Sequence, residues 1–270
     1  MNGSSISILV NTTDSFEDCW VPFFTLFKNF WPSYSGKIYL NTETKDFSYS
    51  GLNIVCIKNG LINHTWSQCL IYALDTIEED LLIYMQEDYF LDYAVNIHEL
   101  SRFLSVFKRG NYDCLHLTNQ CNQGPFIDII GENRIWEIPR GVRYRASTQA
   151  AIWRKEALSS ILVPWENGWE FERFGSKRSN IYLSKVVCVN QDLYGSHEKS
   201  VISYVFTGII KGKWNKAVVE CFQFNNIVVN YTLRGFVSKQ NKFDIKQKFR
   251  SILRLTRSSL LDFYYTKLYN

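Results

Sequence analysis

Short apolar runs alternate along the first part of the chain with longer segments whose apolar residues recur at helical spacing. This alternation is typical of an α/β protein built on a largely parallel sheet. The apolar runs predict strands at residues 5–10, 37–40, 53–57, 81–85 and 113–117. The segments between them predict helices at residues 16–30, from Thr65 or Ser67 to Ile77, and at residues 97–108.

The pattern loosens beyond Thr118, where Gly124, Pro125 and Gly131 interrupt it. In this part we expect a β excursion at residues 135–144, strands at 149–153 and 182–189, and helices at 155–162 and 170–178. The sequence contains no internal repeat and no low-complexity stretch. We therefore expect one α/β domain over residues 1–235, followed by a C-terminal segment over residues 236–270.

The composition is that of a globular protein with a substantial core. Of the 270 residues, 46% are hydrophobic and 16% are aromatic, so some rings are candidates to line a site for sugars or bases. The seven cysteines include no C-x-x-C pair, which argues against a zinc site or disulfide framework and for a reducing compartment. Because we find no signal peptide and no membrane-spanning run, we expect a cytoplasmic protein.

The net charge of +4 is unevenly distributed. Residues 236–270 carry eight basic and two acidic residues, 8 − 2 = +6, which leaves −2 for the rest. Apolar residues of this tail fall mainly at helical spacings, at Ile245, Phe249, Ile252, Leu253, Leu260 and Leu261. Such a helix can lie on the anionic inner face of the cell membrane through residues 239–261, or dock on the domain with its cations solvated. Nucleic acid is not an expected partner, because the body lacks a matching basic surface.

The most informative segment is LLIYMQEDYF at residues 81–90, where an apolar strand stops at Glu87 and Asp88. Buried acids cost free energy unless they are paired, so we expect both where the strand leaves the sheet. Ligands bind at this edge of α/β sheets, and two carboxylates there can hold a divalent metal together with the phosphates of a nucleotide. The alternative is a strand that ends in a solvated acidic turn.

Polar clusters also follow other predicted strands, at residues 11–14, at Glu43 and at residues 169–178. Their order, together with the segment QAAIWRKEALSSILVPWENGWEFERFGSKRS at residues 149–179, resembles the GT-A fold glycosyltransferases, which use sugar nucleotides as donors. The resemblance covers about residues 5–189. It implies an α/β, GT-A-like (Rossmann-like), mainly parallel sheet flanked by helices, here with a C-terminal helical tail.

In inverting members of this family, an acid at the start of the helix that faces the acceptor is the general base. By this resemblance, Glu170 is the first candidate and Glu172 the second. A carboxylate near a helix N-terminus stays deprotonated, as a base must. The alternative for Glu170 is a helix-capping acid, or an acid paired with Arg173 or Arg178.

The metal motif of the family is an Asp-x-Asp pattern, and this chain has Gln86, Glu87 and Asp88 in its place. The resemblance implies Asp88 as the first ligand of Mg²⁺ or Mn²⁺, Glu87 as the second candidate, and His197 as a late further ligand. The alternative for His197 is an ordinary exposed loop residue. Without a metal, Lys, Arg or helix N–H groups must offset the charge of the departing diphosphate.

The resemblance also implies a nucleotide site at the strand ends. Residues after the first strand would hold the base and ribose, Glu43 would take a ribose hydroxyl or the base edge, and the start of the next helix would touch the donor. The candidates are Asn11, Thr12, Thr13, Asp14, Glu43, Trp66, Ser67, Gln86 and Glu87. Each can also be an ordinary loop or capping residue, as Asp14 and Ser67 would be in any protein.

We therefore expect an enzyme that transfers a sugar with inversion from a nucleotide-diphosphate sugar, with UDP favoured, to a hydroxyl of a growing surface glycan on a lipid carrier. One alternative is a sugar-1-phosphate nucleotidyltransferase, although the segment after the first strand lacks the Gly-rich, basic phosphate loop of such enzymes. The other is a non-catalytic glycan-binding or scaffold protein. Sugar transfer requires Asp88 and Glu170 to converge on one cleft.

Overall fold

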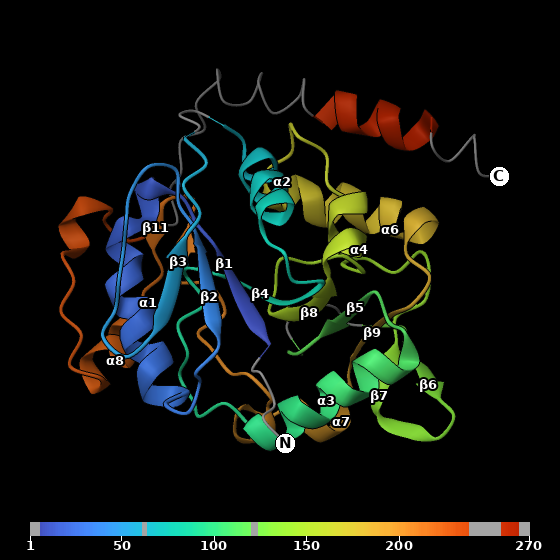
Figure 1. The fold of residues 1–270 in the computed structure, drawn as a ribbon, viewed down its shortest axis with the longest axis horizontal. Helices are drawn as coiled ribbons and strands as arrows, with labels where there is room; N and C mark the ends of the chain where they lie inside the picture. Colours follow the sequence, from blue (N-terminus) through green and yellow to red (C-terminus); the bar gives the residue numbers. More distant parts are fainter. Residues whose placement is uncertain (1–5, 61–63, 120–123, 238–254, 265–270) are drawn as a thin grey trace.

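The computed structural model describes residues 6–60, 64–119, 124–237 and 255–264. A nine-stranded sheet crosses the centre of this part of the chain, with helices packed around it (Figure 1). Its strands are β1 (Ser7–Asn11), β2 (Lys37–Asn41), β3 (Asn53–Cys56), β4 (Leu81–Gln86), β5 (Cys114–His116), β6 (Ile127–Ile129), β7 (Glu132–Glu137), β8 (Ala151–Arg154) and β9 (Val186–Val189). A separate hairpin consists of β10 (Ile209–Ile210) and β11 (Lys213–Trp214).

The strand order in the sheet is β3-β2-β1-β4-β8-β5-β9-β7-β6. β3, β2, β1 and β4 pair in parallel, and so do β5 and β9. β8 runs against both of its neighbours, β4 and β5, and β7 runs against β9 and β6. In the described sheet, only β7 and β8 therefore oppose the common direction, and the carboxyl ends of β1, β2 and β4 share one edge.

The helices are α1 (Glu17–Phe30), α2 (Trp66–Thr76), α3 (Ile97–Gly110), α4 (Lys155–Ser160), α7 (Gln191–Tyr194) and α8 (Ala217–Phe224). α5 (Gly168–Glu170), the π-helical segment η2 (Phe171–Gly175) and α6 (Ser176–Tyr182) follow one another without a break and are called the α5–α6 helix below. Short 3₁₀ turns are η1 (Asp14–Phe16), η3 (His197–Lys199) and η4 (Tyr231–Leu233).

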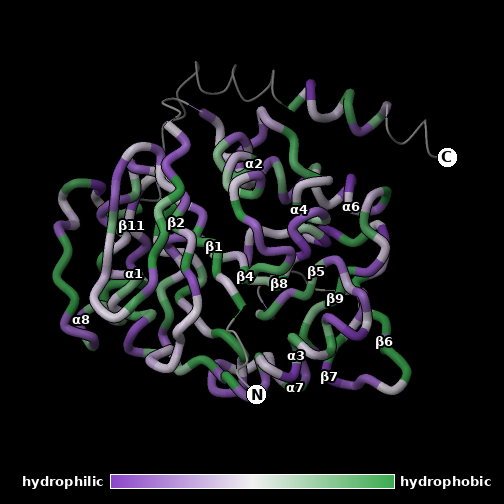
Figure 2. Tube along the Cα trace, viewed as in Figure 1, coloured by the Kyte–Doolittle hydropathy of each residue, from purple (hydrophilic) through white to green (hydrophobic). Residues whose placement is uncertain are grey.

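Each face of the sheet has its own hydrophobic core, because side chains along a strand alternate between the two faces. Ile8 and Val10 of β1 pack with residues of α1, α3 and α8, whereas Leu9 packs with residues of α2 and α4. All three side chains are fully buried. Hydrophobic stretches accordingly run through the central strands in Figure 2.

The predicted α/β fold, with a mainly parallel sheet flanked by helices, is confirmed. Thr65 is the N-cap of α2: its hydroxyl accepts from the backbone N–H of Gln68 (3.1 Å), and its own N–H donates to the Gln68 side chain (3.0 Å). Of the two starts that the sequence left open for this helix, Thr65 is therefore correct, and Ser67 lies inside the first turn.

Three predictions in the second half differ from the structure. The late strand begins only at Val186, because α6 extends to Tyr182. The β excursion ends at Glu137 and pairs with β6, a short, largely exposed strand that shows no apolar run. Residues 200–237, for which the pattern predicts no element, contain the β10–β11 hairpin and α8.

Residues 255–264 of the predicted tail are helical and are called the C-terminal helix below. The helical pattern predicted at Ile245, Phe249, Ile252 and Leu253 lies outside the described residues, so the boundary at residue 235 stays a prediction. No helix in the described ranges has both the length and the apolar character needed to cross a membrane.

Candidate active site

Three side-chain amides meet at the carboxyl ends of the parallel strands. Asn11 is the register partner of both Asn41 and Gln86. The Asn41 amide nitrogen donates to the Asn11 side-chain oxygen (2.7 Å), and the Tyr84 hydroxyl accepts from the amides of Asn11 (3.4 Å) and Gln86 (3.3 Å). Asn11 and Asn41 are buried, so they belong to the floor of this edge and Gln86 is the member nearest its surface.

Asp14 and Glu43 hold together the loops that follow β1 and β2. The Glu43 carboxylate accepts from the backbone N–H of Asp14 (3.1 Å), and the Asp14 carboxylate accepts from the N–H of Glu43 (2.9 Å) and the Thr44 hydroxyl (2.6 Å). Burial raises the pKa of Asp14, but the hydrogen bonds from Thr44 and nearby backbone N–H groups outweigh it and lower the pKa overall. Both acids thus have a structural task in the ligand-free chain.

The other predicted residues after β1 are also engaged within the protein. The Trp20 indole N–H donates to the Thr12 hydroxyl (2.9 Å), and the Thr13 and Ser15 hydroxyls lie 2.7 Å apart. Six of the predicted nucleotide-binding residues line neither of the two cavities found beside this edge: Asn11, Thr12, Thr13, Asp14, Glu43 and Ser67.

A cleft of about 910 Å³ opens beside the end of β4. Gln86, Glu87 and Asp88 line it from the strand, and Glu170 and Glu172 line it from the α5–α6 helix. The acids at the end of β4 and those of the helix, far apart in the sequence, therefore meet in one cleft. Other residues that line it are Phe16, Trp66, Tyr144, Arg173, Phe206 and Lys211.

Trp66 and Ser67 have different surroundings at the start of α2. Trp66 lines the cleft, with its ring packed against Phe171 at a centroid distance of 5.3 Å. Ser67 is fully buried, and its hydroxyl has no hydrogen-bond partner within the described part of the chain. Of the two predicted donor contacts, only Trp66 faces the cleft.

Glu87 and Asp88 are adjacent buried acids. Burial raises the pKa of both side chains, and the neighbouring Asp88 charge raises the pKa of Glu87 further. The Asp88 carboxylate accepts hydrogen bonds from the Thr207 hydroxyl (2.9 Å) and the Ile209 N–H (3.0 Å). Asp88 therefore fixes the start of the β10–β11 hairpin against the end of β4.

These side chains do not form a ready metal site. Oδ2 of Asp88 already accepts two protein hydrogen bonds, so this carboxylate has only Oδ1 left to offer a cation. The neutral Gln86 fills the first place of the triplet, and His197 lines neither cavity but pairs with Asp92 (3.0 Å). Over the described part of the chain, no group of three or more His, Cys, Asp or Glu side chains is placed to hold a metal ion.

Glu170 caps the helix on which it lies. Its carboxylate accepts from the backbone N–H of Asn167 (3.0 Å), and the Asn167 side chain accepts from the N–H groups of Trp169 (3.0 Å) and Glu170 (2.9 Å). Arg178 pairs with the fully buried Glu166 (3.0 Å). The capping alternative raised for Glu170 is therefore realised in this structure.

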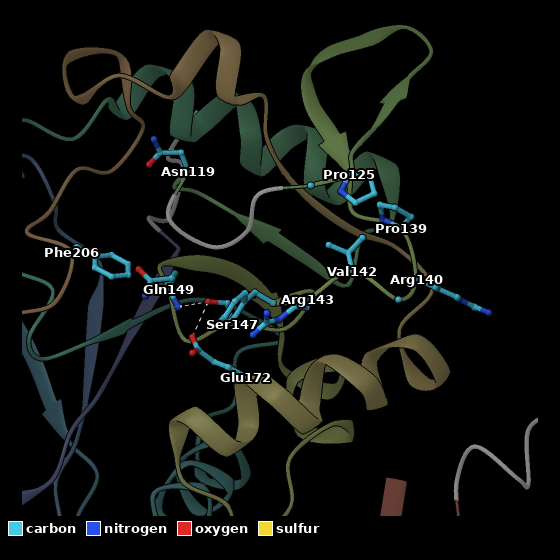
Figure 3. Close-up of a pocket in the computed structure, with 13 residues that line it drawn as sticks. Asn119, Pro125, Pro139, Arg140, Val142, Arg143, Ser147, Gln149, Glu172 and Phe206 are labelled. Carbon is cyan, nitrogen blue, oxygen red and sulfur yellow. Dashed lines mark hydrogen bonds between the residues drawn. The ribbon is translucent and has the colours of Figure 1, made fainter. Parts of the chain in front are cut away.

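Glu172 lies where the cleft meets a second cavity of about 1080 Å³. Its Oε1 accepts from the Ser147 hydroxyl (3.1 Å), the Thr148 N–H (3.0 Å) and the Thr148 hydroxyl (2.9 Å). In Figure 3 Glu172 extends from the helix toward Ser147 and Gln149, whereas Arg140 points away. Both cavities are lined by Tyr144, Gln149, Glu172 and Phe206.

Sequence reasoning missed the hydrogen-bonded group behind Glu172. The Tyr89 hydroxyl donates to the Thr148 carbonyl (3.0 Å), and the Gln149 side chain donates to Tyr89 (3.2 Å) and accepts from Tyr204 (2.6 Å). The Tyr89 and Tyr204 rings stack at 4.7 Å. The high aromatic content was the only hint, because these residues come from three distant parts of the chain.

Sequence reasoning also missed Lys211. Lys211 and Gly212 both have positive φ angles, 52° and 77°, and form the tight turn between β10 and β11. Lys-Gly is not one of the Asn-Gly or Asp-Gly pairs that mark such turns, and the charged Lys213 follows it, so the turn has only a weak sequence signal. The position of Lys211 at the cleft depends on the hydrogen bonds that Asp88 accepts from the hairpin, and it could not be predicted from the sequence.

No protein-family model matches the chain, and no curated protein matches it. Solved structures similar to it include S. aureus TarS 1–349 in complex with UDP, at a TM-score of 0.47 and 14% identity over 68% of this chain and 57% of that chain. A UDP-glucose pyrophosphorylase complexed with UDP-glucose has a TM-score of 0.43 and 8% identity, over 69% and 90% of the two chains. An active-site mutant of LgtC has a TM-score of 0.38 and 7% identity, over 70% and 74%.

The chain thus spans little more than half of the TarS fragment. At these TM-scores and identities the similarities do not assign the chain to a family, and its function has to be inferred from the geometry of the site.

Proposed function

We propose that this protein is a glycosyltransferase that moves a sugar from a nucleotide-diphosphate donor to a hydroxyl of an acceptor glycan. The observation that supports this most is Glu172, a carboxylate held in a fixed orientation between two adjoining cavities. Direct transfer needs two substrates side by side with a base next to the acceptor hydroxyl. The cavity beside the strand ends suits the nucleotide, since α/β sheets bind ligands at that edge.

In this proposal Glu172 is the general base and Glu170 the second candidate. Ser147 and Thr148 hold one Glu172 oxygen, and these three hydrogen bonds leave the other oxygen to receive a proton. Glu172 takes the proton of the acceptor hydroxyl, whose oxygen attacks the anomeric carbon. The bond between that carbon and the diphosphate oxygen breaks, and the diphosphate leaves with the electron pair. Attack from the face opposite the diphosphate inverts the configuration.

The cations that line the donor cleft, Lys211 and Arg173, are proposed to offset the charge of the departing diphosphate. Fixed positive groups that face a developing negative charge lower the barrier of such a reaction. We assign no step to the Mg²⁺ or Mn²⁺ that the family pattern implies, because Gln86 is neutral and one oxygen of Asp88 is engaged with the hairpin.

The second cavity is proposed to receive the acceptor, a growing surface glycan on a lipid carrier at the cytoplasmic face of the membrane. Tyr144 and Phe206 are 40% and 55% exposed and line both cavities, so their rings can stack on sugar faces at the point of transfer. A UDP-sugar is the donor that we test first.

A panel of nucleotide sugars tests the proposal through thermal stabilisation. A donor present at about 100 times its dissociation constant adds about 2.7 kcal/mol to the free energy of unfolding, so one nucleotide class should raise the melting temperature clearly. That donor should then release its nucleotide diphosphate when acceptor glycans are added.

Two outcomes would contradict the proposal. Absence of stabilisation and of donor turnover with every nucleotide sugar would favour a glycan-binding or scaffold protein. Release of pyrophosphate from a nucleoside triphosphate and a sugar 1-phosphate would identify a nucleotidyltransferase.

A further inference from the structure

Polar side chains of the C-terminal helix face the body of the protein. Ser258 and Asp262 are both buried. The Trp165 indole N–H donates to the Ser258 hydroxyl (3.1 Å), and the Asp262 carboxylate pairs with Arg178 (3.5 Å) and Lys177 (3.7 Å). Polar contacts therefore hold this helix on the α5–α6 helix and the loop before it.

The large apolar side chains of the same helix point outward. Leu260, Phe263 and Tyr264 are 69%, 60% and 59% exposed. Because they are three and four positions apart, they share one side of the helix. A helix docked on a domain normally buries its apolar stripe and exposes its polar one, and here the arrangement is reversed. The outward side thus suits an environment less polar than water.

The C-terminal segment to which this helix belongs is rich in cations. Asp262, the one acid among residues 255–264, is turned inward against Arg178. Arg257 is exposed and lies over the Trp165 ring at 3.8 Å. In the sequence, residues 236–270 together carry a net charge of +6. A second copy of the chain carries this same positive charge and would be repelled by it, whereas an anionic lipid surface attracts basic residues near it.

We propose that Leu260, Phe263 and Tyr264 insert into the interface of an anionic lipid bilayer. Aromatic and leucine side chains on one side of a helix, with cations beside them, are the features of helices that lie in the membrane plane. Leu255, on the same helix, lines the donor cleft, so the bilayer lies near the catalytic site. This inference rests on the proposed function and extends it, because a protein bound to the bilayer lies beside a lipid-linked acceptor.

The experiment measures flotation of the full chain with vesicles of phosphatidylcholine alone or mixed with phosphatidylglycerol, in the absence of donor. We expect binding only to the anionic vesicles, weakened by added salt. The triple variant Leu260→Gln, Phe263→Gln and Tyr264→Gln should bind the anionic vesicles more weakly, by about tenfold or a larger factor. Phe224→Gln is the matched control, because Phe224 is 84% exposed on α8, far from the C-terminal helix (Figure 1), and should bind like the wild type.

Three results would overturn this inference: no binding of the wild type to anionic vesicles, unchanged binding of the triple variant, or a lipid-free dimer that the triple variant abolishes. If the triple variant unfolds at a lower temperature than the wild type, vesicle binding is measured with Leu260→Gln alone, which should also bind more weakly. Nucleotide binding is measured on the same samples. Vesicle binding without nucleotide binding would reject the proposed function and leave this inference in place.

Discussion

Glu170 and Glu172 lie two positions apart on one helix, yet their carboxylates meet different donors. Glu170 is folded back onto Asn167 at the helix start, whereas Glu172 receives its hydrogen bonds from Ser147 and Thr148 of another segment. The π-helical segment begins between them, at Phe171. Which of the two carboxylates can serve an acceptor therefore depends on a tertiary contact that helical periodicity does not encode.

We predict that Glu172→Gln lowers turnover by about 10² or more, because the amide cannot take the proton of the acceptor hydroxyl. Nucleotide binding should stay close to that of the wild type, since Glu172 lies at the acceptor end of the cleft. Steady-state kinetics and calorimetric titration with UDP measure the two effects.

Glu170→Gln is the matched variant for this comparison. A glutamine at this position can still accept the N–H of Asn167, so stability and turnover should change little. If Glu170→Gln abolished turnover and Glu172→Gln did not, the roles of the two acids would have to be exchanged.

At the scale of elements, the β10–β11 hairpin joins the acidic end of β4 to the cleft. Asp88 holds the hairpin through Thr207 and Ile209, and the turn then places Lys211 among the residues that line the donor cavity. A buried carboxyl with a raised pKa is costly to ionise. The buried position of Asp88 is explained by the hydrogen bonds through which it holds the hairpin.

We predict that Lys211→Gln lowers kcat/KM by about tenfold to a hundredfold, because a positive charge opposite the leaving diphosphate is lost. Lys213→Gln, on the other side of the same turn, removes an equal charge from a residue that lines neither cavity and should have little effect. Dialysis against a chelator should leave most of the wild-type activity. Loss of activity that Mg²⁺ or Mn²⁺ restores would show that a metal carries out the task given to Lys211.

The elements that the sequence predicts best are those with local signals. Thr65 and Gln68 form a capping box that fixes the start of α2, and the apolar run before Glu87 fixes the end of β4. β6 and the hairpin have no such signal beyond a turn, since their pairing depends on distant strands and on Asp88. The acids of the site could thus be listed from the sequence. The residues that donate hydrogen bonds to Glu172 and Asp88, and the position of Lys211, could not.

At the scale of the whole molecule, the C-terminal helix is fixed by charges that carry a pH dependence. Burial raises the pKa of Asp262 to about 6, although Arg178 and Lys177 lower it in part. In the unfolded chain the pKa of Asp is about 3.9. Between these two values the folded protein binds the extra proton, so this group makes the free energy of unfolding fall as the pH rises from about 4 to about 6.

We predict that Asp262→Asn removes this dependence. The variant should gain about 1 kcal/mol of stability relative to the wild type between about pH 4 and pH 7, a value reduced for solvent screening. Thermal melts across this range measure the difference. A difference between the two proteins that stays constant with pH would mean that Asp262 does not titrate in the folded state.

The pair formed by Glu166 and Arg178 has a consequence for how ligands enter. Both residues are buried, and the Glu166 carbonyl also accepts the N–H of Ser67 (3.2 Å), so the start of α2 and the α5–α6 helix are tied to one internal ion pair. Separating a buried pair costs roughly 3–5 kcal/mol, so these two walls move as a unit. The hairpin across the cleft is fixed as well, by its hydrogen bonds to Asp88 and by the Trp214 ring stacked on Phe90 (6.1 Å), so a ligand enters between surfaces that are already in place.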